Sequence, residues 1–185
     1  AASNTPVCTG TPLNLTGGPA TMTSYAWSGP AGFSSALQSP QVSATATAAM
    51  AGLYTLTVTD ASGCTATATT TVAVNTAPVA TAASNTPVCT GTPLNLTGGP
   101  ALMTSYAWTG PNGFTSTAQS PTVSASATAA MAGNYILTVT DASGCIGTAT
   151  ATVVVNTAPV ATAASNSPAC TGTTLNLTGG PAGMT

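Results

Sequence analysis

The sequence predicts an all-β protein made of tandem β-sandwich domains, and three observations support this fold class. Its cysteines, tryptophans and central tyrosines recur every 81 residues, with no insertion or deletion between copies. Ala, Val and Leu alternate with Thr and Ser over runs of roughly six to ten residues, a pattern typical of strands with one buried face. Clusters of Gly, Pro and Ser separate these runs, and no segment has helical periodicity of useful length.

The repeat period defines the expected domains. The segment SNTPVCTGTPLNLTGGPA begins at Ser3, returns unchanged at Ser84 and returns with small changes at Ser165. A period of 81 residues is too long for a solenoid unit and fits one small domain per repeat. The chain is expected to be a window cut from a longer array. The expected units are one domain in residues 1–76, a second in 77–157 and the N-terminal part of a third in 158–185.

The first half of the repeat contains two predicted strands. Pro6 and Pro12 disfavour a helix before the first of them. In that strand Leu13 and Leu15 alternate with polar residues, so both leucines are expected to face the core. The next strand, TSYAWSGP, places its Tyr and Trp on one face, and the turn GPAGF ends it.

The second half of the repeat contains the clearest strands. A short strand around Val42 comes first, and the segment AGLYTLTVTD then places Tyr54, Leu56 and Val58 on one face and threonines on the other. The turn ASG leads into CTATATTTVAVN, whose Ala and Val residues are expected to point inward. The segment TAPVATAA follows and is a candidate first strand for the next domain.

Three motifs occur in both complete repeats: a Tyr-x-Trp strand, a Gly-x-Tyr opening of the penultimate strand, and a Ser-Gly-Cys turn. In these motifs the sequence resembles the Ig-like and PKD-like repeats of very large secreted bacterial surface proteins, such as adhesins and gliding-associated proteins of the Bacteroidota type. The resemblance covers the whole repeat and implies Ig-like β-sandwiches that serve as spacers, stalks or adhesive modules. The Gly-x-Tyr motif resembles the tyrosine corner of Ig domains. The aromatic residues expected in the core are Tyr25, Trp27, Tyr54, Tyr106, Trp108 and Tyr135.

The composition excludes several classes of function. The chain has no Lys, Arg or His, and Asp60 and Asp141 are its only acidic residues. Nucleic acids and anionic membranes are bound largely through Lys and Arg, so neither a nucleic-acid partner nor membrane insertion is expected. A nucleophilic Ser or Thr would have no base to activate it, so the protein is not expected to be an enzyme or to bind a cofactor. Each Asp is expected to bond its own turn backbone rather than to bind calcium.

The cysteines suggest disulfides and an oxidising compartment. Pairing within each repeat is favoured, and one such bridge closes a loop of about 57 residues, worth roughly 4 kcal/mol in the chain-entropy model. A zinc site is disfavoured because each repeat offers only two thiols and no His. Pairing across repeats stays open, because Cys8 and Cys64 would lie at opposite ends of the domain if Cys8 begins its second strand. The favoured bridges are Cys8–Cys64 and Cys89–Cys145, with a partner for Cys170 beyond the sequence; the alternatives are Cys64–Cys89 and Cys8–Cys145.

Two further surface features are candidates for function. The motif Asn-Leu-Thr matches the acceptor pattern for N-glycosylation at Asn14, Asn95 and Asn176, and the many Thr and Ser residues also allow O-linked glycans. The ladder TATATTTV is disfavoured as an ice-binding row because the second copy reads IGTATATV. It is a strand without charge or Pro, however, and such an edge favours pairing between copies.

These observations predict a structural protein at the outside of a bacterial cell. The array is expected to build an extracellular fibre, stalk or surface filament, with itself as the main partner and glycans as a further one, since an uncharged surface favours association. Two alternatives stay open. One is an adhesin stalk that presents a distal binding domain, and the other is a spacer or carbohydrate-binding module of a secreted polysaccharide-degrading enzyme.

Overall fold

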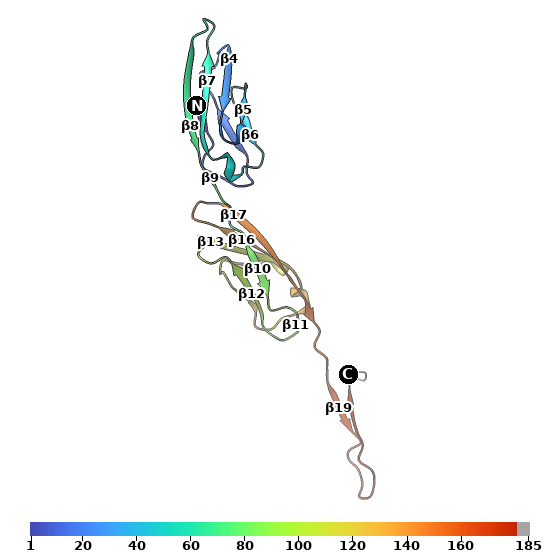
Figure 1. The fold of residues 1–185 in the computed structure, drawn as a ribbon. Coiled ribbons are helices and arrows are strands. Elements are labelled where there is room, and N and C mark those ends of the chain that lie inside the picture. Colours follow the sequence, from blue (N-terminus) through green and yellow to red (C-terminus); the bar gives the residue numbers. More distant parts are fainter. Residues whose placement is uncertain (181–185) are drawn as a thin grey trace.

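The structure, a computed structural model, describes residues 1–180 of the 185-residue chain, so the last five residues of the expected third repeat lie outside it. Two sandwiches follow one another along an elongated molecule, and a hairpin lies beyond the second (Figure 1). The all-β prediction is confirmed: between residues 1 and 180 the strands are interrupted only by turns and by short 3-10 helices. No helix in this part of the chain has the length and hydropathy needed to cross a membrane.

The first sandwich, called repeat 1, contains nine strands and two 3-10 helices. They are β1 (Ala2–Ser3), β2 (Val7–Cys8), β3 (Leu13–Thr16), β4 (Ser24–Ser28), η1 (Pro30–Gly32), β5 (Ser34–Ser35), β6 (Gln41–Ser43), η2 (Ala48–Met50), β7 (Gly52–Thr59), β8 (Thr65–Val72) and β9 (Val74–Asn75).

The second sandwich, called repeat 2, has the same order of elements, and a hairpin of β19 and β20 follows it. These elements are β10 (Thr81–Ser84), β11 (Val88–Cys89), β12 (Leu94–Gly99), β13 (Ser105–Gly110), η3 (Pro111–Gly113), β14 (Phe114–Ser116), β15 (Thr122–Ser124), η4 (Ala129–Met131), β16 (Gly133–Thr140), β17 (Ile146–Val153), β18 (Val155–Asn156), β19 (Thr162–Ser165) and β20 (Leu177–Gly180).

Each repeat packs two antiparallel sheets face to face. In repeat 1 the four-stranded sheet has the order β5-β4-β7-β8, and the smaller sheet has the order β1-β3-β6. A short parallel pair joins β2 to β9, so the start and the end of the repeat lie side by side. Repeat 2 has the corresponding sheets, and its parallel pair is β11 with β18.

The core of each repeat is small and is centred on one Trp and one Tyr. Trp27 and Tyr54 are buried among Leu13, Leu15 and Leu56 in repeat 1. The indole Nε1 of Trp27 donates a hydrogen bond to the Gln38 carbonyl (3.2 Å). Leu13 and Leu15 alternate with exposed residues on β3, because successive side chains of a strand point to opposite faces.

Two of the aromatic residues that the sequence places in the core lie at its margin instead. Tyr25 and Tyr106 are half-buried against the two cores. The phenol of Tyr25 donates a hydrogen bond to the Pro19 carbonyl (2.9 Å), and Tyr106 bonds the Pro100 carbonyl in the same way (2.8 Å). A tyrosine can occupy such a margin because its ring is apolar while its hydroxyl needs a polar partner.

The second conserved-position tyrosine of each repeat makes the contact expected of a tyrosine corner. Tyr54 is fully buried, and its hydroxyl donates to the Met50 carbonyl four residues upstream (2.9 Å). Tyr135 bonds Met131 in the same way (3.0 Å). Burial raises the pKa of both phenols above the ordinary value of 10.0.

This burial predicts loss of stability in strong alkali. Because the folded pKa is raised, the protonated phenol is favoured, so its contribution to stability is complete below pH 10 and is lost as the pH rises through the folded pKa. Unfolding by urea should give a free energy that stays level to about pH 10 and then falls. Tyr54→Phe with Tyr135→Phe should flatten that fall, at a cost of about 0.5–1.5 kcal/mol per lost hydrogen bond. An unchanged fall in the double variant would contradict the assignment.

Candidate functional site at the junction between repeats

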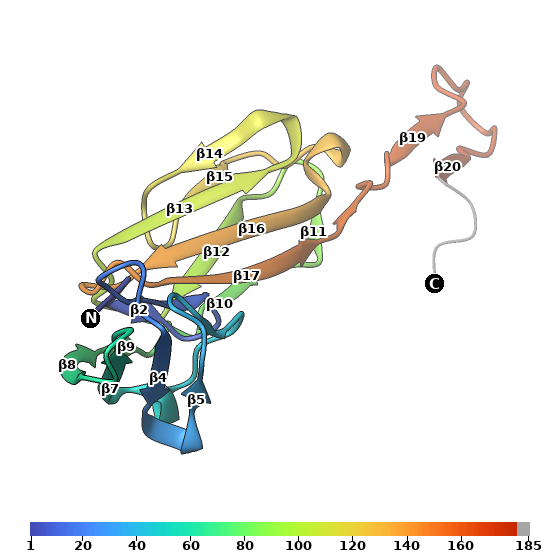
Figure 2. The ribbon, with the colours of Figure 1, turned by 90° about the horizontal axis from the view of Figure 1, so that it is seen from above.

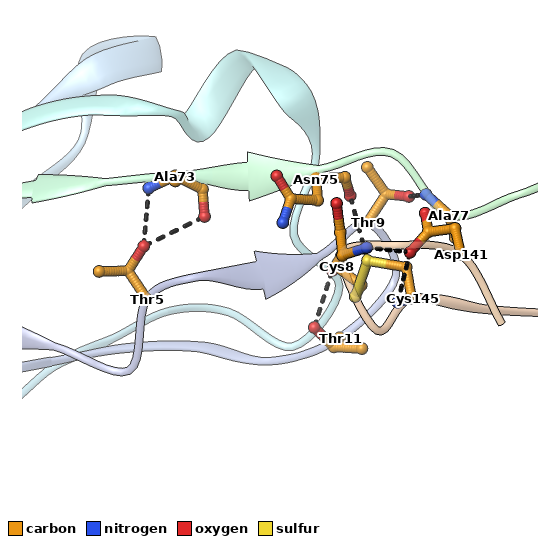
Figure 3. The surroundings of a disulfide bond; sticks show 10 residues. Thr5, Cys8, Thr9, Thr11, Ala73, Asn75, Ala77, Asp141 and Cys145 are labelled. Atoms are coloured by element: carbon orange, nitrogen blue, oxygen red, sulfur yellow. Dashed lines mark hydrogen bonds between the residues drawn. A yellow bond between two sulfur atoms is a disulfide. The ribbon is translucent and has the colours of Figure 1, made fainter. Parts of the chain in front are cut away.

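The structure joins the two repeats by a disulfide between Cys8 and Cys145, whose Cα atoms are 5.6 Å apart (Figure 3). The favoured prediction of bridges within each repeat is therefore wrong: Cys8 does not pair with Cys64, and Cys145 does not pair with Cys89. The alternative Cys8–Cys145 bridge is the one observed. Cys64, Cys89 and Cys170 are free and exposed in the described part of the chain.

Strand geometry explains why the bridge crosses between repeats. Cys8 lies beside β9, where the last strand of repeat 1 ends, whereas Cys64 precedes β8, where that strand begins. The eight residues of β8 span roughly 26 Å at about 3.3 Å per residue, and a disulfide requires Cα atoms within about 7 Å. The turn that carries Cys145 comes from the near end of repeat 2 and meets Cys8 there.

The backbone around Cys8 is fixed by hydrogen bonds to the end of its own repeat. Cys8 pairs with Asn75 in the parallel ladder, and the next amide, Thr9, donates to the Asn75 carbonyl (2.8 Å). The hydroxyl of Thr11 donates to the Cys8 carbonyl (2.7 Å). The sulfur atom of Cys8 is thus held at the point where the chain leaves repeat 1 (Figure 3).

Two threonine side chains also hold the segment that leaves repeat 1. The Thr5 hydroxyl accepts a hydrogen bond from the Ala73 amide (2.7 Å) and contacts the Ala73 carbonyl (3.2 Å). The Thr9 hydroxyl accepts from the Ala77 amide (2.9 Å). These bonds connect the first and last strands and set the direction in which the chain runs toward repeat 2.

A tight turn around Asp141 presents Cys145 to the junction. One carboxylate oxygen of Asp141 accepts hydrogen bonds from the amides of Ser143 (2.8 Å) and Cys145 (2.9 Å). Gly144 has φ +78°, a left-handed conformation that favours glycine. Asp141 therefore orients a turn, as the sequence predicts, and residues 1–180 contain no group of three acidic, His or Cys residues that could bind a metal.

The segment between the repeats packs onto repeat 2. β10 pairs with β12, with Thr81 opposite Gly99 and Ala82 opposite Gly98. Ala80 and Ala82 are half-buried against the core of repeat 2. The segment TAPVATAA is thus both the connection and the first strand of the next domain, as the sequence suggests.

This packing buries a face of β17 that is open on the equivalent strand of repeat 1. Gly147 and Ala151 on β17 are buried, whereas the matching residues on β8, Ala66 and Thr70, are exposed and half-buried. A Cβ atom added at Gly147 would overlap the Pro78 carbonyl oxygen and would lie 3.3 Å from the Ala80 amide nitrogen. Glycine at position 147 therefore allows the close approach of the connecting segment.

Replacing Gly147 with Ala should weaken the junction. The Pro78 backbone cannot move away freely, because hydrogen bonds hold Ala77 on one side and β10 on the other. We expect Gly147→Ala to lower the free energy of unfolding by about 1–3 kcal/mol, measured by urea unfolding with tryptophan fluorescence.

Thr148→Ala is the matched control for this experiment. Thr148 is the next residue of β17 and its side chain is exposed, so its loss should change the free energy by less than about 0.5 kcal/mol. Equal effects of the two substitutions would contradict the close approach at Gly147.

The structure also places the other predicted surface sites. Asn14, Asn95 and Asn176 are exposed, and the carboxamide oxygen of Asn95 accepts a hydrogen bond from Thr122 (2.8 Å). β8 and β17 are edge strands, because each is the last strand of its four-stranded sheet. The exposed threonines of β8 lie on the outer face of that edge, so no charged side chain guards it.

Comparison with known proteins agrees with the fold alone. No protein-family model and no curated protein matches the chain. Among solved structures it is similar to the N-terminal four Ig domains of Dscam1 isoform 1.9, with 18% identity, 81% of this chain and 42% of that chain covered, and a TM-score of 0.34. It is also similar to murine CEACAM1b, with 11% identity, 83% and 97% covered, and a TM-score of 0.38.

A third similarity is to a chain in the complex of the mouse coronavirus receptor-binding domain with its murine receptor, with 12% identity, 83% and 98% covered, and a TM-score of 0.40. The chain spans less than half the length of the Dscam1 fragment. Taken with the sheets described above, the fold class is an Ig-like β-sandwich. Similarities at this level carry no conclusion about activity or partner.

Proposed function

We propose that this chain is part of a structural protein whose repeats build an extracellular fibre, stalk or surface filament at a bacterial cell surface. The units of the array are residues 1–76, residues 77–157 and the repeat that starts at residue 158. The single observation that supports this function most strongly is the disulfide between neighbouring repeats. A bridge placed between domains limits their relative movement, which a load-bearing array requires and an isolated binding domain does not.

The surface chemistry supports the same function. The molecule has a net charge of −2 and no cationic side chain, so neighbouring copies do not repel one another strongly. The unguarded edges of β8 and β17 offer backbone donors and acceptors to a second copy. Lateral association through these edges, with glycans on exposed Asn or Thr residues, is the arrangement that we propose for the assembled fibre.

An enzymatic role for this segment has no support in its chemistry. The two carboxylates lie in separate repeats and each is bonded to its own turn. General acid–base chemistry needs a positioned base, and the sequence contains no His or Lys. A spacer within a larger secreted protein remains compatible with the mechanical role.

Immunogold electron microscopy tests the proposed function. Antibodies against this chain should label filaments or stalks that project from the producing cells, at regular intervals along their length. Label confined to the cell interior, or to a soluble protein without filaments, would overturn the proposal. Binding of the chain to a glycan array with defined specificity would favour a carbohydrate-binding module instead.

A further inference from the structure

Repeat 1 carries an open apolar groove at its edge strand, which we call the β8 groove. The β7–β8 turn beside it is at the end of repeat 1 away from repeat 2 (Figure 1). The residues that line the β8 groove are Gly18, Pro19, Leu56, Val58, Ala66 and Ala68.

Repeat 2 shows what covers the equivalent surface. There the connecting segment, residues 76–82, lies over the face of β17, and its Ala80 and Ala82 pack against the core. Its backbone extends the smaller sheet by pairing with Gly98 and Gly99. The matching residues of repeat 1, Gly17 and Gly18, have no strand partner within residues 1–180. The β8 groove therefore lacks the segment that completes the same sandwich in repeat 2.

The same end of repeat 1 carries a free thiol in the geometry of a bridged one. Asp60 accepts hydrogen bonds from the amides of Ser62 (2.8 Å) and Cys64 (2.9 Å), as Asp141 does for Cys145. Cys145 is fully buried in its bridge to the preceding repeat, whereas Cys64 is exposed and free. Groove and thiol are thus two separate features of repeat 1 that repeat 2 has satisfied through its neighbour.

The opposite end of repeat 2 carries the complementary parts. Cys89 lies on β11 beside β18, as Cys8 lies on β2 beside β9, and it is exposed and free. The Ala158 amide donates to the Thr90 hydroxyl (2.9 Å), which repeats the bond that directs the connecting segment out of repeat 1. Residues 157–163 have the same sequence as residues 76–82, and all of their side chains but that of Ala158 are exposed.

We propose that two copies of this chain dock head to tail: residues 157–163 of one copy fill the β8 groove of the next, and Cys89 of the first forms a disulfide with Cys64 of the second. This contact reproduces the junction between repeats 1 and 2, in which a connecting segment and a first-cysteine-to-second-cysteine bridge occur together. Such a contact is heterologous, so its repetition gives an open filament. The inference rests on the proposed function and adds a longitudinal contact to it.

Docking requires an exchange of strands. Residues 163–165 and residues 1–3 have the same sequence, Ala-Ala-Ser, and both would occupy the place beside β3 of the second copy. In the free chain Thr162 to Ser165 pair only with β20, in a two-stranded hairpin whose residues are almost all exposed. A hairpin of two strands is marginally stable alone, so its opening is offset by pairing with a complete sandwich.

Repeat 1 differs from repeat 2 at one position of the acceptor. Ala66 stands where Gly147 allows the close approach of Pro78, so the docked backbone must lie further from β8 than its counterpart lies from β17. This difference makes the contact between copies weaker than the contact within the chain. It also supplies a test, because Ala66→Gly should strengthen docking.

Bridge formation needs an oxidant, and a disulfide such as oxidised glutathione supplies it. The Cys89 thiolate attacks one sulfur of oxidised glutathione and releases one glutathione thiolate. The Cys64 thiolate of the second copy then attacks the Cys89 sulfur of the mixed disulfide and releases the other. Two protein thiols lose two protons and two electrons, and one glutathione disulfide becomes two glutathione molecules.

Cysteine variants of the full chain in a glutathione redox buffer test the proposal on non-reducing gels. Cys170→Ser is present in every sample, so that Cys64 and Cys89 are the free thiols. This parent should form a ladder of dimers and longer species. Adding Cys64→Ser or Cys89→Ser should abolish the ladder, and an equal mixture of the two should give dimers only. The mixture should form dimers at least about ten times faster than either variant alone, because docking raises the effective concentration of the two thiols.

The remaining outcomes decide the case in the same experiment. Ala66→Gly should speed the ladder, and a free peptide with the sequence of residues 157–163 should slow it. Dimers of either single variant at the rate of the mixture would show unspecific oxidation and overturn the proposal. A Cys64–Cys89 bridge within one molecule would also overturn it. Gold-labelled filaments on cells without this cross-link would leave the proposed function standing and remove only the head-to-tail contact.

Discussion

Pulling on the oxidised chain from its two ends should produce almost no extension from the two repeats. The Cys8–Cys145 bridge spans a sequence separation of 137 residues, which includes nearly all of both repeats. Force applied at the termini passes through the disulfide and bypasses the backbone between the two cysteines. Only the short segments outside the bridge can lengthen.

Reduction of the bridge should release this hidden length. The 137 residues correspond to roughly 450–490 Å of extended chain at about 3.3–3.6 Å per residue. Single-molecule force spectroscopy should therefore show two unfolding events in a reducing buffer and none of that size in an oxidising one. Cys8→Ser should behave as the reduced chain, and Cys64→Ser should behave as the oxidised parent. Equal extension of the oxidised and reduced chains would contradict the bridge.

Replacing Trp108 with Ala should unfold repeat 2 while repeat 1 remains folded. Trp108 is 1% exposed, and its Nε1 donates to the Gln119 carbonyl (3.2 Å). Removing a buried Trp costs about 3–5 kcal/mol, and small domains have total stabilities near the low end of about 5–15 kcal/mol. The core of repeat 2 has few other large side chains with which to compensate.

Hydrogen exchange followed by mass spectrometry measures this difference. Amides of β13, β16 and β17 should lose protection, whereas those of β4 and β7 should keep it. The fluorescence of Trp27 should still report a folded repeat 1. Leu102→Ala is the control, since Leu102 is 97% exposed and its loss should change stability by less than about 0.5 kcal/mol. Full protection of repeat 2 in the Trp108 variant would contradict the central role of this core.

Much of the fold could be predicted from the sequence because its signals are local. Alternation with a period of two identifies a strand and its buried face, as for Leu13 and Leu15 on β3. Gly and Pro clusters identify the turns, and the 81-residue period shows that whatever forms once forms again. The turn role of Asp60 and Asp141 is equally local, because the bonded amides lie within four residues.

The disulfide could not be predicted in the same way because it depends on how two domains meet. Proximity in sequence favours Cys8 with Cys64, but these residues lie at opposite ends of a strand. The one available signal is that β8 and β9 together carry the chain from the Cys64 turn to the ladder beside Cys8. Reading these strands as one long connection removes the bridge within the repeat and leaves the bridge to the next one.

Covalent connection of neighbouring repeats can be tested directly, because the chain has only two Asp residues. A protease that cleaves before Asp divides the monomeric, alkylated chain into residues 1–59, 60–140 and 141–185. Mass spectrometry without reduction should find 1–59 joined to 141–185, with 60–140 separate and carrying alkylated Cys64 and Cys89. Residues 60–140 joined by disulfides to both other peptides would instead show bridges within each repeat, and that result would contradict the junction described above.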